Sequence, residues 1–481
     1  MRVLFVSSEA YPLIKTGGLA DVSGSLPSAL KKSNIDIKIL IPGYPEVLEK
    51  VENQRSLGTL QVFSFISCEI LVGTMPNSTL EVIVIKNSVL YERNGGPYID
   101  AKSQDWHDNP LRFGVLSKVA SILSSKTMLW DWLPEIVHCN DWQTGLTPYY
   151  IRQNYASQVK TLLSIHNMAF QGNYSRDWIS RLELNPHDFQ LQGYEFYAQL
   201  SFLKAGIFYA DKLSTVSPNY AKEIQTDAFG FGMQGLLQLR KDDITGILNG
   251  IDLDEWNPKK DSHLPYTYNE KQLAGKAKIK TYLQEKSLLE VNDKIPLLGV
   301  VSRLTYQKGL DILIEIMPEL IDLNCQIVVL GSGEKSFEER FTAYAKQYPK
   351  QVSVTIGYNE PFSHQIMAGA DIFIMPSRFE PCGLNQLYGL RYGTPPIVTN
   401  TGGLADSICN TTLETVISNT ATGFVMENVT KLSLLVTIKH ALSVWQDKKI
   451  WKKIQINGMN QDIGWGHSAN AYIALYEGML K

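Results

Sequence analysis

The strongest constraint on the fold of this chain is an alternation of short apolar runs with helical segments, which occurs twice along the sequence. The apolar runs lie at residues 3–6, 35–42, 135–141, 159–167, 212–217 and 243–250, and again at 295–302, 325–333, 352–358, 371–377 and 395–400. Strands that alternate with helices are typical of open, mostly parallel sheets. The sequence therefore predicts an α/β fold with two doubly wound domains of about 200 residues each.

Residues 254–271 interrupt this alternation. The segment reads DEWNPKKDSHLPYTYNEK, is polar, contains two prolines and has no sustained period. We interpret it as a linker between the two domains, which agrees with a chain of 481 residues being too long for one ordinary core. Helices are predicted on both sides of it, at residues 19–32, 309–321, 363–370 and 384–393.

Composition narrows the class of protein. Apolar residues make up 44% of the chain, and the formal net charge of −3 gives no indication of nucleic acid or a membrane surface as a partner. The N-terminus lacks the apolar core of a signal peptide, and no run approaches the ~18 apolar residues of a membrane span. The five cysteines form no C-x-x-C pair, which argues against a disulfide framework or a zinc site: Cys68, Cys139, Cys325, Cys382 and Cys409. We expect a cytoplasmic protein.

Paired glycines follow the first apolar run, in the motif KTGG at residues 15–18. The glycines allow backbone N–H groups to approach a ligand, the following helix start is partially positive, and Lys15 adds a full charge, so an anion is expected there. The motif is neither the dinucleotide fingerprint nor the Walker pattern. A loop lysine beside a tight turn is the alternative interpretation.

The second half carries further candidates at predicted strand ends, where ligands of open parallel sheets bind. Arg303 and Lys308 lie five residues apart in SRLTYQKGLD, and a fork-shaped cation beside a point cation suits a diphosphate. Tyr358 offers a ring for a nucleobase. A solubilising surface pair and a core tyrosine are the alternatives. With two such domains, we expect the ligand in the cleft between them.

The densest stretch is SRFEPCGLNQLYGLRYGTPP at residues 377–396. Glu380 follows a predicted strand and precedes a glycine turn that leads into a helix, whose N-terminus favours an anion. A carboxylate beside such a helix start indicates a role toward sugar hydroxyls or a cationic transition state. TGGLAD at residues 401–406 repeats the glycine pair before a helix.

Polar residues also end two predicted strands of the first half. Asp141 lies in CNDWQTG, and His166 lies in IHNMAFQG beside a glycine-rich loop. For His166 a structural histidine and a functional one are equally favoured. Asp252 and Asp254 form an Asp-x-Asp pair without further ligands at the suspected domain junction, so we interpret them as a structural or hinge feature and not as a metal site.

Taken together, these motifs resemble the bacterial and plant glycogen/starch synthase family. The resemblance runs from residue 1 to about residue 430, with matching segments in order: KTGGLADVSGSLP, DNPLRFGVLSKVA, HCNDWQTGL, HNMAFQG, FLKAGIFYAD, STVSPNYAKEI, ILNGIDLDEWNP, SRLTYQKGLD, PSRFEPCGLNQLYGLRYGT and TGGLAD. It implies a GT-B fold, in which two Rossmann-like domains face each other across a deep cleft. Residues 1–250 with the C-terminal helix 463–481 would form one domain, and residues 251–462 the other.

The same resemblance implies an activity. Members of the family transfer glucose from ADP-glucose to the non-reducing end of an α-1,4-glucan with retention of configuration. The implied partners are an ADP-glucose donor and a glycogen or α-glucan acceptor, with no metal and no other cofactor. The preference for ADP-glucose over UDP-glucose rests on the resemblance alone. No plastid transit segment precedes Met1, so we expect a bacterial glycogen enzyme.

Roles for individual residues are likewise implied by the matching motifs. As catalytic residues, Lys15 would contact the donor phosphates or glucose, Arg303 and Lys308 would neutralise the diphosphate, and Glu380 would be the essential carboxylate. The substrate-binding residues would be Gly18, Asp21, Asp141, His166, Asn249, Tyr358, Cys382, Gly383 and Leu384. Among these, Tyr358 would pack on the adenine, and Cys382, Gly383 and Leu384 would hold sugar and phosphate with backbone groups.

One departure and three rival functions bear on this interpretation. Many retaining relatives have a second Glu eight residues after the first, whereas this chain has Tyr388, which weighs against sucrose synthase-like enzymes. A glucan phosphorylase would need a pyridoxal-phosphate lysine and a far longer chain. A nicotinamide dehydrogenase would need a G-x-G-x-x-G turn. A non-catalytic glucan-binding protein would have no use for Lys15 together with Glu380.

Overall fold

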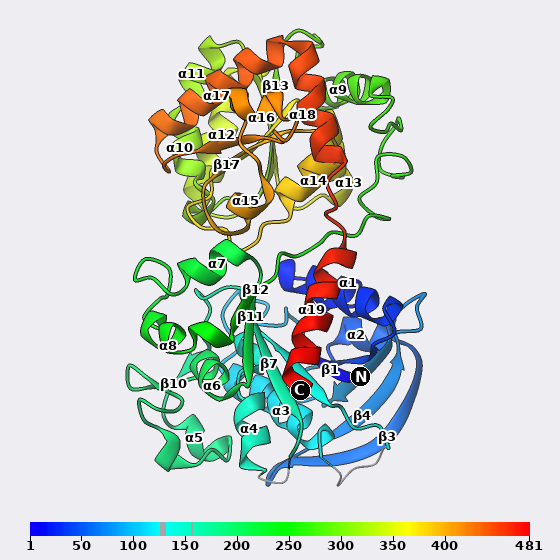
Figure 1. Cartoon of the computed structure of the whole chain (residues 1–481), viewed down its shortest axis with the longest axis vertical. Coiled ribbons are helices and arrows are strands. Elements are labelled where there is room, and N and C mark those ends of the chain that lie inside the picture. Colours follow the sequence, from blue (N-terminus) through cyan, green and yellow to red (C-terminus); the bar gives the residue numbers. More distant parts are fainter. Residues whose placement is uncertain (126–130, 155–156) are drawn as a thin grey trace. The chain divides into compact units, whose positions relative to one another are not determined.

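The structure, a computed structural model, describes residues 1–125, 131–154 and 157–481, and it divides into two α/β units (Figure 1). The first unit comprises Met1–Asn249 together with Trp465–Lys481, and the second comprises Gly250–Gly464. Among the described residues, no helix combines the length and the apolar character that a membrane-spanning helix needs.

The first unit is built on a sheet whose strand order, within the described residues, is β12-β11-β7-β6-β1-β2-β5-β4-β3. Its strands are β1 (Arg2–Val6), β2 (Asp36–Pro42), β3 (Glu52–Phe63), β4 (Ile66–Thr74), β5 (Glu81–Lys86), β6 (Ile136–Asn140), β7 (Lys160–Ile165), β11 (Lys212–Thr215) and β12 (Ile244–Gly246). Pairing is parallel from β12 to β5, and each of these strands except β5 overlaps a predicted apolar run.

An antiparallel edge, formed by β5, β4 and β3, was not predicted from the sequence. The first half of β3 is exposed, so it lacks the apolar run that marks a buried strand. A small second sheet, in the order β8-β10-β9, joins β8 (Asn173–Tyr174), β10 (Gln199–Ser201) and β9 (Glu195–Phe196). The helices of this unit are α1 (Gly18–Lys32), α2 (Pro45–Lys50), α3 (Asn109–Leu123), α4 (Thr147–Gln153), α5 (Trp178–Arg181), α6 (Phe202–Tyr209), α7 (Pro218–Glu223), α8 (Gln234–Leu239) and α19 (Trp465–Leu480).

The second unit has an all-parallel sheet in the order β15-β14-β13-β16-β17-β18. Its strands are β13 (Leu297–Val301), β14 (Gln326–Gly331), β15 (Val352–Ile356), β16 (Ile372–Met375), β17 (Pro396–Thr399) and β18 (Phe424–Met426). Its helices are α9 (Ala274–Lys286), α10 (Leu310–Glu315), α11 (Met317–Asp322), α12 (Lys335–Gln347), α13 (Glu360–Gly369), α14 (Asn385–Arg391), α15 (Gly402–Ser407), α16 (Leu413–Ile417), α17 (Lys431–Gln446) and α18 (Lys448–Met459). The alternation of the second half therefore reappears as parallel strands joined by helices.

One predicted helix proved to be two. The sequence predicted a single helix over residues 309–321, but the structure has α10 and α11, separated at Ile316. Pro318 lies in the first turn of α11. Because proline lacks an N–H group and disfavours a helical conformation for the residue before it, the chain restarts a helix there.

The interpretation of residues 254–271 as a linker was wrong. The segment has neither helix nor strand, yet Trp256, Leu264 and Tyr268 are buried in the core of the second unit. The indole of Trp256 lies between His364, at 3.8 Å between ring centroids, and Tyr388, at 3.6 Å. An irregular segment can fill a core without any periodicity, so its polar composition concealed this packing.

The last helix, α19, belongs to the first unit and packs against α1 (Figure 1). The hydroxyl of Tyr476 in α19 lies 2.7 Å from Nδ1 of His138 in β6, whose Nε2 lies 2.6 Å from Oγ of Ser164. Burial lowers the pKa of His138 from 6.5 to about 3, so the folded chain holds a neutral imidazole. Because the unfolded chain binds this proton more readily, His138 makes stability fall as the pH drops from 6.5 toward 3.

We predict that Tyr476→Phe destabilises the first unit. The substitution leaves Nδ1 of His138 buried without a partner, which costs about 1–3 kcal/mol. Urea-induced unfolding followed by circular dichroism measures the effect. Glu477→Gln, at an exposed position of the same helix, is the control and should change stability little. Equal unfolding midpoints for the two variants would contradict the role given to the Tyr476 hydroxyl.

Candidate active site

Three loops of the second unit pack against one another at the carboxyl ends of β13, β16 and β17. Gly309 has a φ of +66°, and a Cβ atom there would lie 1.9 Å from the carbonyl oxygen of Pro376. A Cβ atom on Gly403 would lie 2.2 Å from the carbonyl oxygen of Cys382. Only glycine permits such close backbone approach, so these glycines let the loops after the three strands form one continuous surface.

This arrangement brings Lys308 and Glu380 together. Nζ of Lys308 lies 2.5 Å from Oε2 of Glu380, and Oγ of Ser377 donates to the same oxygen at 3.0 Å. Glu380 is only 7% exposed. A nearly buried carboxylate requires partners of this kind, and the pair places a cation and an acid side by side at the strand ends. Ser377 was not singled out from the sequence, although it lies in the quoted motif.

Arg303 stays apart from this pair. Its side chain is exposed and, among the described residues, makes no hydrogen bond or ion pair. Tyr358 lies beyond the end of β15 and is 75% exposed. The structure therefore does not bond Arg303 or Tyr358 to Lys308 or Glu380, and both side chains are presented to solvent, where a ligand can reach them.

The turn before α14 contains Cys382, Gly383 and Leu384. Cys382 is a buried free thiol, and Gly383 adopts a φ of +70°. Nε2 of Gln386 donates to the carbonyl oxygens of Cys382 and Gly383 at 3.0 and 3.1 Å. Leu384 is the N-cap residue of α14 and provides no side-chain cap. The carbonyl groups of Cys382 and Gly383 are thus already bonded, while the N-cap residue gives the first N–H groups of α14 no side-chain acceptor.

In the first unit, the KTGG loop differs from the prediction. The sequence predicted an anionic ligand at its backbone N–H groups, but the carboxylate of Glu9 accepts from Thr16 N at 2.6 Å and from Gly17 N at 3.3 Å. Nζ of Lys15 lies 2.7 Å from Asp21. Gly18 begins α1. Sequence reasoning missed Glu9 because nothing local distinguishes a carboxylate that folds back on a loop seven residues later.

Asp141 and His166 meet at the ends of β6 and β7. Oδ1 of Asp141 accepts from the His166 backbone N at 3.3 Å, and Nε2 of His166 lies 3.0 Å from Oδ1 of Asn140. Because Nδ2 of Asn140 donates to the Val6 carbonyl, its Oδ1 is the acceptor here, so we assign the imidazole proton to Nε2. Nδ1 of His166 is then a hydrogen-bond acceptor.

Burial sets the charges of this pair. It raises the pKa of Asp141 from 3.8 to about 7, mainly because a buried carboxylate is poorly solvated, and the charge of Glu9 adds to this. Burial lowers the pKa of His166 from 6.5 to about 4. At neutral pH the imidazole is therefore neutral, and the Asp141 carboxyl is protonated far more readily than an exposed one; its protonated form can both donate and accept hydrogen bonds.

Asn249 completes the predicted residues of the first unit. It lies beyond β12 and is 6% exposed, and its Oδ1 has no hydrogen-bond partner among the described residues. Buried amide oxygens are nearly always bonded, so this atom is a candidate acceptor for a ligand or for water.

Metal ligands do not cluster in the part of the chain that the structure describes, where no group of three or more His, Cys, Asp or Glu side chains could hold an ion. Oδ1 of Asp252 instead accepts from the backbone N of Asp254 at 2.8 Å. Asp254 pairs with Lys260 at 2.7 Å. Asp252 and Asp254 thus form a local turn, in line with the structural role expected for them.

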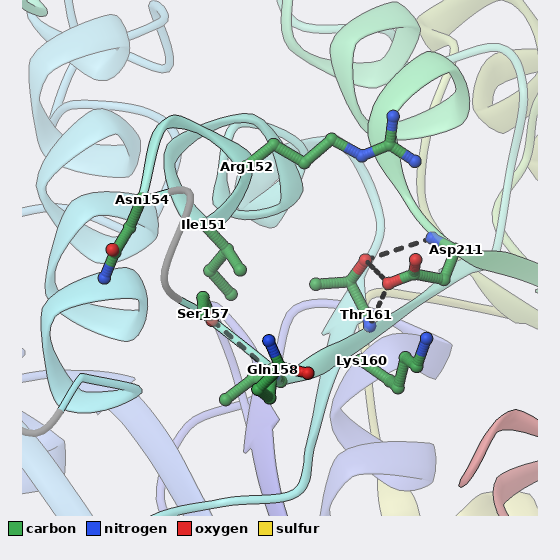
Figure 2. Close-up of a pocket in the computed structure, with 9 residues that line it drawn as sticks. Ile151, Arg152, Asn154, Ser157, Gln158, Lys160, Thr161 and Asp211 are labelled. Carbon is green, nitrogen blue, oxygen red and sulfur yellow. Dashed lines mark hydrogen bonds between the residues drawn. The ribbon is translucent and has the colours of Figure 1, made fainter. Parts of the chain in front are cut away.

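A polar hollow of about 240 Å³ lies at a different place in the first unit, where Lys160 and Thr161 begin β7 (Figure 2). There, the backbone N and Oγ1 of Thr161 donate to Asp211 at 2.7 and 2.8 Å. None of the residues predicted to bind substrate lines it. The carboxylate of Asp211 is already bonded to Thr161. This hollow is therefore not part of the candidate site.

Comparisons with known sequences identify the family of the chain. Residues 2–239 match the family described as starch synthase catalytic domain, and residues 284–455 match glycosyl transferases group 1. The glycogen synthase of Nitrosomonas eutropha is 46% identical over 485 residues, which cover 100% of this chain and 97% of that protein. The glycogen synthase of Nitrosospira multiformis is also 46% identical, with coverage of 100% and 98%.

Solved structures of related proteins have the same fold. The catalytic domain of starch synthase IV from Arabidopsis thaliana, bound to ADP and acarbose, has a TM-score of 0.89 and 28% identity, and covers 99% of both chains. A sucrose-phosphate synthase from Thermosynechococcus elongatus, at 16% identity and a TM-score of 0.57 over 99% and 98% of the two chains, shares the fold. The fold is that of the GT-B glycosyltransferases, and the chain belongs to the glycogen synthase family.

Proposed function

We propose that this glycosyltransferase moves glucose from ADP-glucose to the non-reducing end of an α-1,4-glucan and retains the anomeric configuration. The observation that carries the proposal is the pairing of Lys308 with the nearly buried Glu380 at the strand ends of the second unit. The starch synthase IV neighbour was solved with ADP, the diphosphate that such a transfer would release. This supports a nucleoside diphosphate as the leaving group.

Charge neutralisation is the main task of the second unit in this proposal. A diphosphate gains negative charge as its bond to glucose breaks, and preorganised cations stabilise that charge. Lys308 is held ready by Glu380, and Arg303 is unpaired among the described residues, so both can turn toward the phosphates. With these two cations the diphosphate needs no metal, and we propose that none is required. Tyr358, exposed beyond β15, would pack on the adenine.

Glu380 does not resemble a nucleophile of a double displacement. In the described part of the chain its carboxylate contacts Lys308 and Ser377, and no second carboxylate lies among its hydrogen-bond partners. We therefore propose attack of the acceptor hydroxyl on the face that the phosphate leaves, with the departing phosphate oxygen taking its proton. The contribution of the protein is then positioning and electrostatics.

The first unit would supply hydrogen bonds to sugar hydroxyls. Nδ1 of His166 is an acceptor, Oδ1 of Asn249 is buried without a hydrogen-bond partner among the described residues, and burial raises the pKa of the Asp141 carboxyl to about 7. Three groups of mixed donor and acceptor character suit hydroxyl groups better than they suit an ion. In the proposal they bind the transferred glucose and the acceptor end.

The direct test is incubation of the protein with labelled ADP-glucose and glycogen in the presence of EDTA, with UDP-glucose and glucose 1-phosphate as parallel donors. We expect label to enter glycogen from ADP-glucose and to be released by an α-1,4-specific amylase. Proton NMR of an extended maltooligosaccharide should show the α-anomer. Incorporation from glucose 1-phosphate alone would indicate a phosphorylase, and loss of transfer in EDTA would contradict the metal-free proposal.

We predict that Lys308→Ala lowers kcat by about 10²- to 10³-fold, because removal of one preorganised charge-stabilising group typically has this effect. Steady-state kinetics measure the change, and circular dichroism verifies that the variant is folded. Lys453→Ala, which removes an exposed lysine of α18 in the same unit, is the matched control and should keep wild-type kcat. Wild-type turnover in Lys308→Ala would refute the role of this side chain.

A further inference from the structure

Glu9 is a buried acid that the proposed chemistry does not use. It lies beyond the end of β1 and is 2% exposed. Its carboxylate accepts from the backbone N and Oγ1 of Thr16, from the Gly17 N, and from the hydroxyl of Tyr98 at 2.6 Å. Both oxygens are therefore occupied by donors of the protein, and neither is available to a substrate.

These contacts determine which donors of the KTGG loop a ligand can use. The N–H groups of Thr16 and Gly17 are bonded to Glu9, whereas those of Gly18 and Leu19 have no acceptor among the described residues. A Cβ atom on Gly17 or Gly18 would meet no other atom within 4 Å, so packing within the protein does not demand glycine at either position. Lys15 and Gly18 are exposed beside the bonded part of the loop, so a ligand can reach the lysine and the first amide of α1.

The chain leading to this loop is tied to α1 by its backbone. The N–H of Tyr11 donates to the carbonyl of Ala20 at 3.0 Å, and a Cβ atom on Gly24 would lie 2.2 Å from the carbonyl oxygen of Tyr11. The backbone of Tyr11 is therefore held against α1, and Glu9 holds Thr16 and Gly17. Lys15 lies between these two attachment points.

Tyr98 links the same carboxylate to the neighbouring strand end. Its hydroxyl donates to Glu9, and its ring lies 6.5 Å from that of Trp142, the residue after Asp141. Through Tyr98, the carboxylate of Glu9 connects the loop of Lys15 with Trp142, in the loop of Asp141. The two loops are more than a hundred residues apart in the sequence.

We propose that Glu9 is a positioning residue for the donor site: its carboxylate holds the KTGG loop so that the Lys15 ammonium and the Gly18 and Leu19 amides face the nucleotide sugar. This inference rests on the proposed function. Glu9 touches no substrate and acts through Lys15. A misplacement of about 1 Å in a binding group costs on the order of a hundredfold in rate, so loss of this tether should be visible in kinetics.

The experiment is a double-mutant cycle between Glu9 and Lys15, measured with ADP-glucose and glycogen. In Glu9→Gln one acceptor oxygen becomes an NH2 group and the negative charge is lost, which weakens the bonds to the loop. We therefore expect kcat/KM for ADP-glucose to fall about ten- to a hundredfold, with KM for glycogen unchanged. In a Lys15→Ala background the same change should cost less than about threefold, because residues that act as one unit are not additive. Tyr98→Phe removes the hydroxyl that bonds to Glu9 and to Oγ of Ser8, but it leaves the bonds from Thr16 and Gly17 to Glu9 in place, so it should show a smaller effect of the same kind.

The control is Asp108→Asn, which alters another buried acid of the first unit, in this case one that is ion-paired with Arg93. Asp108→Asn should lower the stability of the protein, but its effect on kcat/KM should be additive with that of Lys15→Ala. Additive losses in the Glu9–Lys15 cycle, or wild-type kinetics in Glu9→Gln, would overturn the inference while leaving the proposed function intact. A wild-type protein that fails to use ADP-glucose would instead overturn the function.

Hydrogen–deuterium exchange tests the tether without any substrate. Peptides that contain Thr16 and Gly17 should exchange faster in Glu9→Gln than in the wild type, and those of the Asp108→Asn control should not. Unchanged exchange in Glu9→Gln would show that the carboxylate does not hold the loop.

Discussion

A buried carboxylate must be bonded, and in both units of this protein that requirement organises the loops at the strand ends. In the first unit Glu9 lies beyond β1 and binds the backbone of the KTGG loop. In the second unit Glu380 lies beyond β16 and binds Lys308 and Ser377. Each acid converts a flexible, glycine-containing connection into a loop of defined shape, and in each case a lysine of the candidate site lies on that loop.

Glu380 and Glu9 position the neighbouring lysines in different ways. Glu380 pairs with Lys308 directly, so an incoming phosphate would compete with a carboxylate for the same ammonium group, which is then already placed and largely desolvated. Glu9 bonds to backbone groups beside Lys15 and leaves the ammonium to the more exposed Asp21. Glu380 thus fixes the ammonium group of Lys308 itself, whereas Glu9 fixes the backbone next to Lys15.

Prediction from the sequence succeeded where the signal was local. Runs such as residues 35–42 and 325–333 contain β2 and β14, because strands of a parallel sheet are buried on both faces and are therefore mostly apolar. It failed for residues 254–271, where Trp256 enters the core from a segment without periodicity, and for residues 309–321, where Pro318 restarts the helix. The exposed half of β3 lacked the apolar run altogether.

For the candidate site, too, local features could be predicted from the sequence and long-range contacts could not. Residue types and motif order identified Lys308, Glu380, Asp141 and His166, because glycine turns and polar residues directly after apolar runs are visible in one stretch of sequence. The contacts between these side chains could not be predicted in this way. Lys308 and Glu380 are 72 positions apart in the sequence, and Tyr98 and Glu9 are 89 positions apart. The primary sequence thus indicated most of the buried parallel strands and the polar residues that follow them, but not the antiparallel edge of the first unit. Which donor meets which buried acid, and hence which loop amides stay open to a ligand, depended on folding, because such contacts join residues that no local pattern connects.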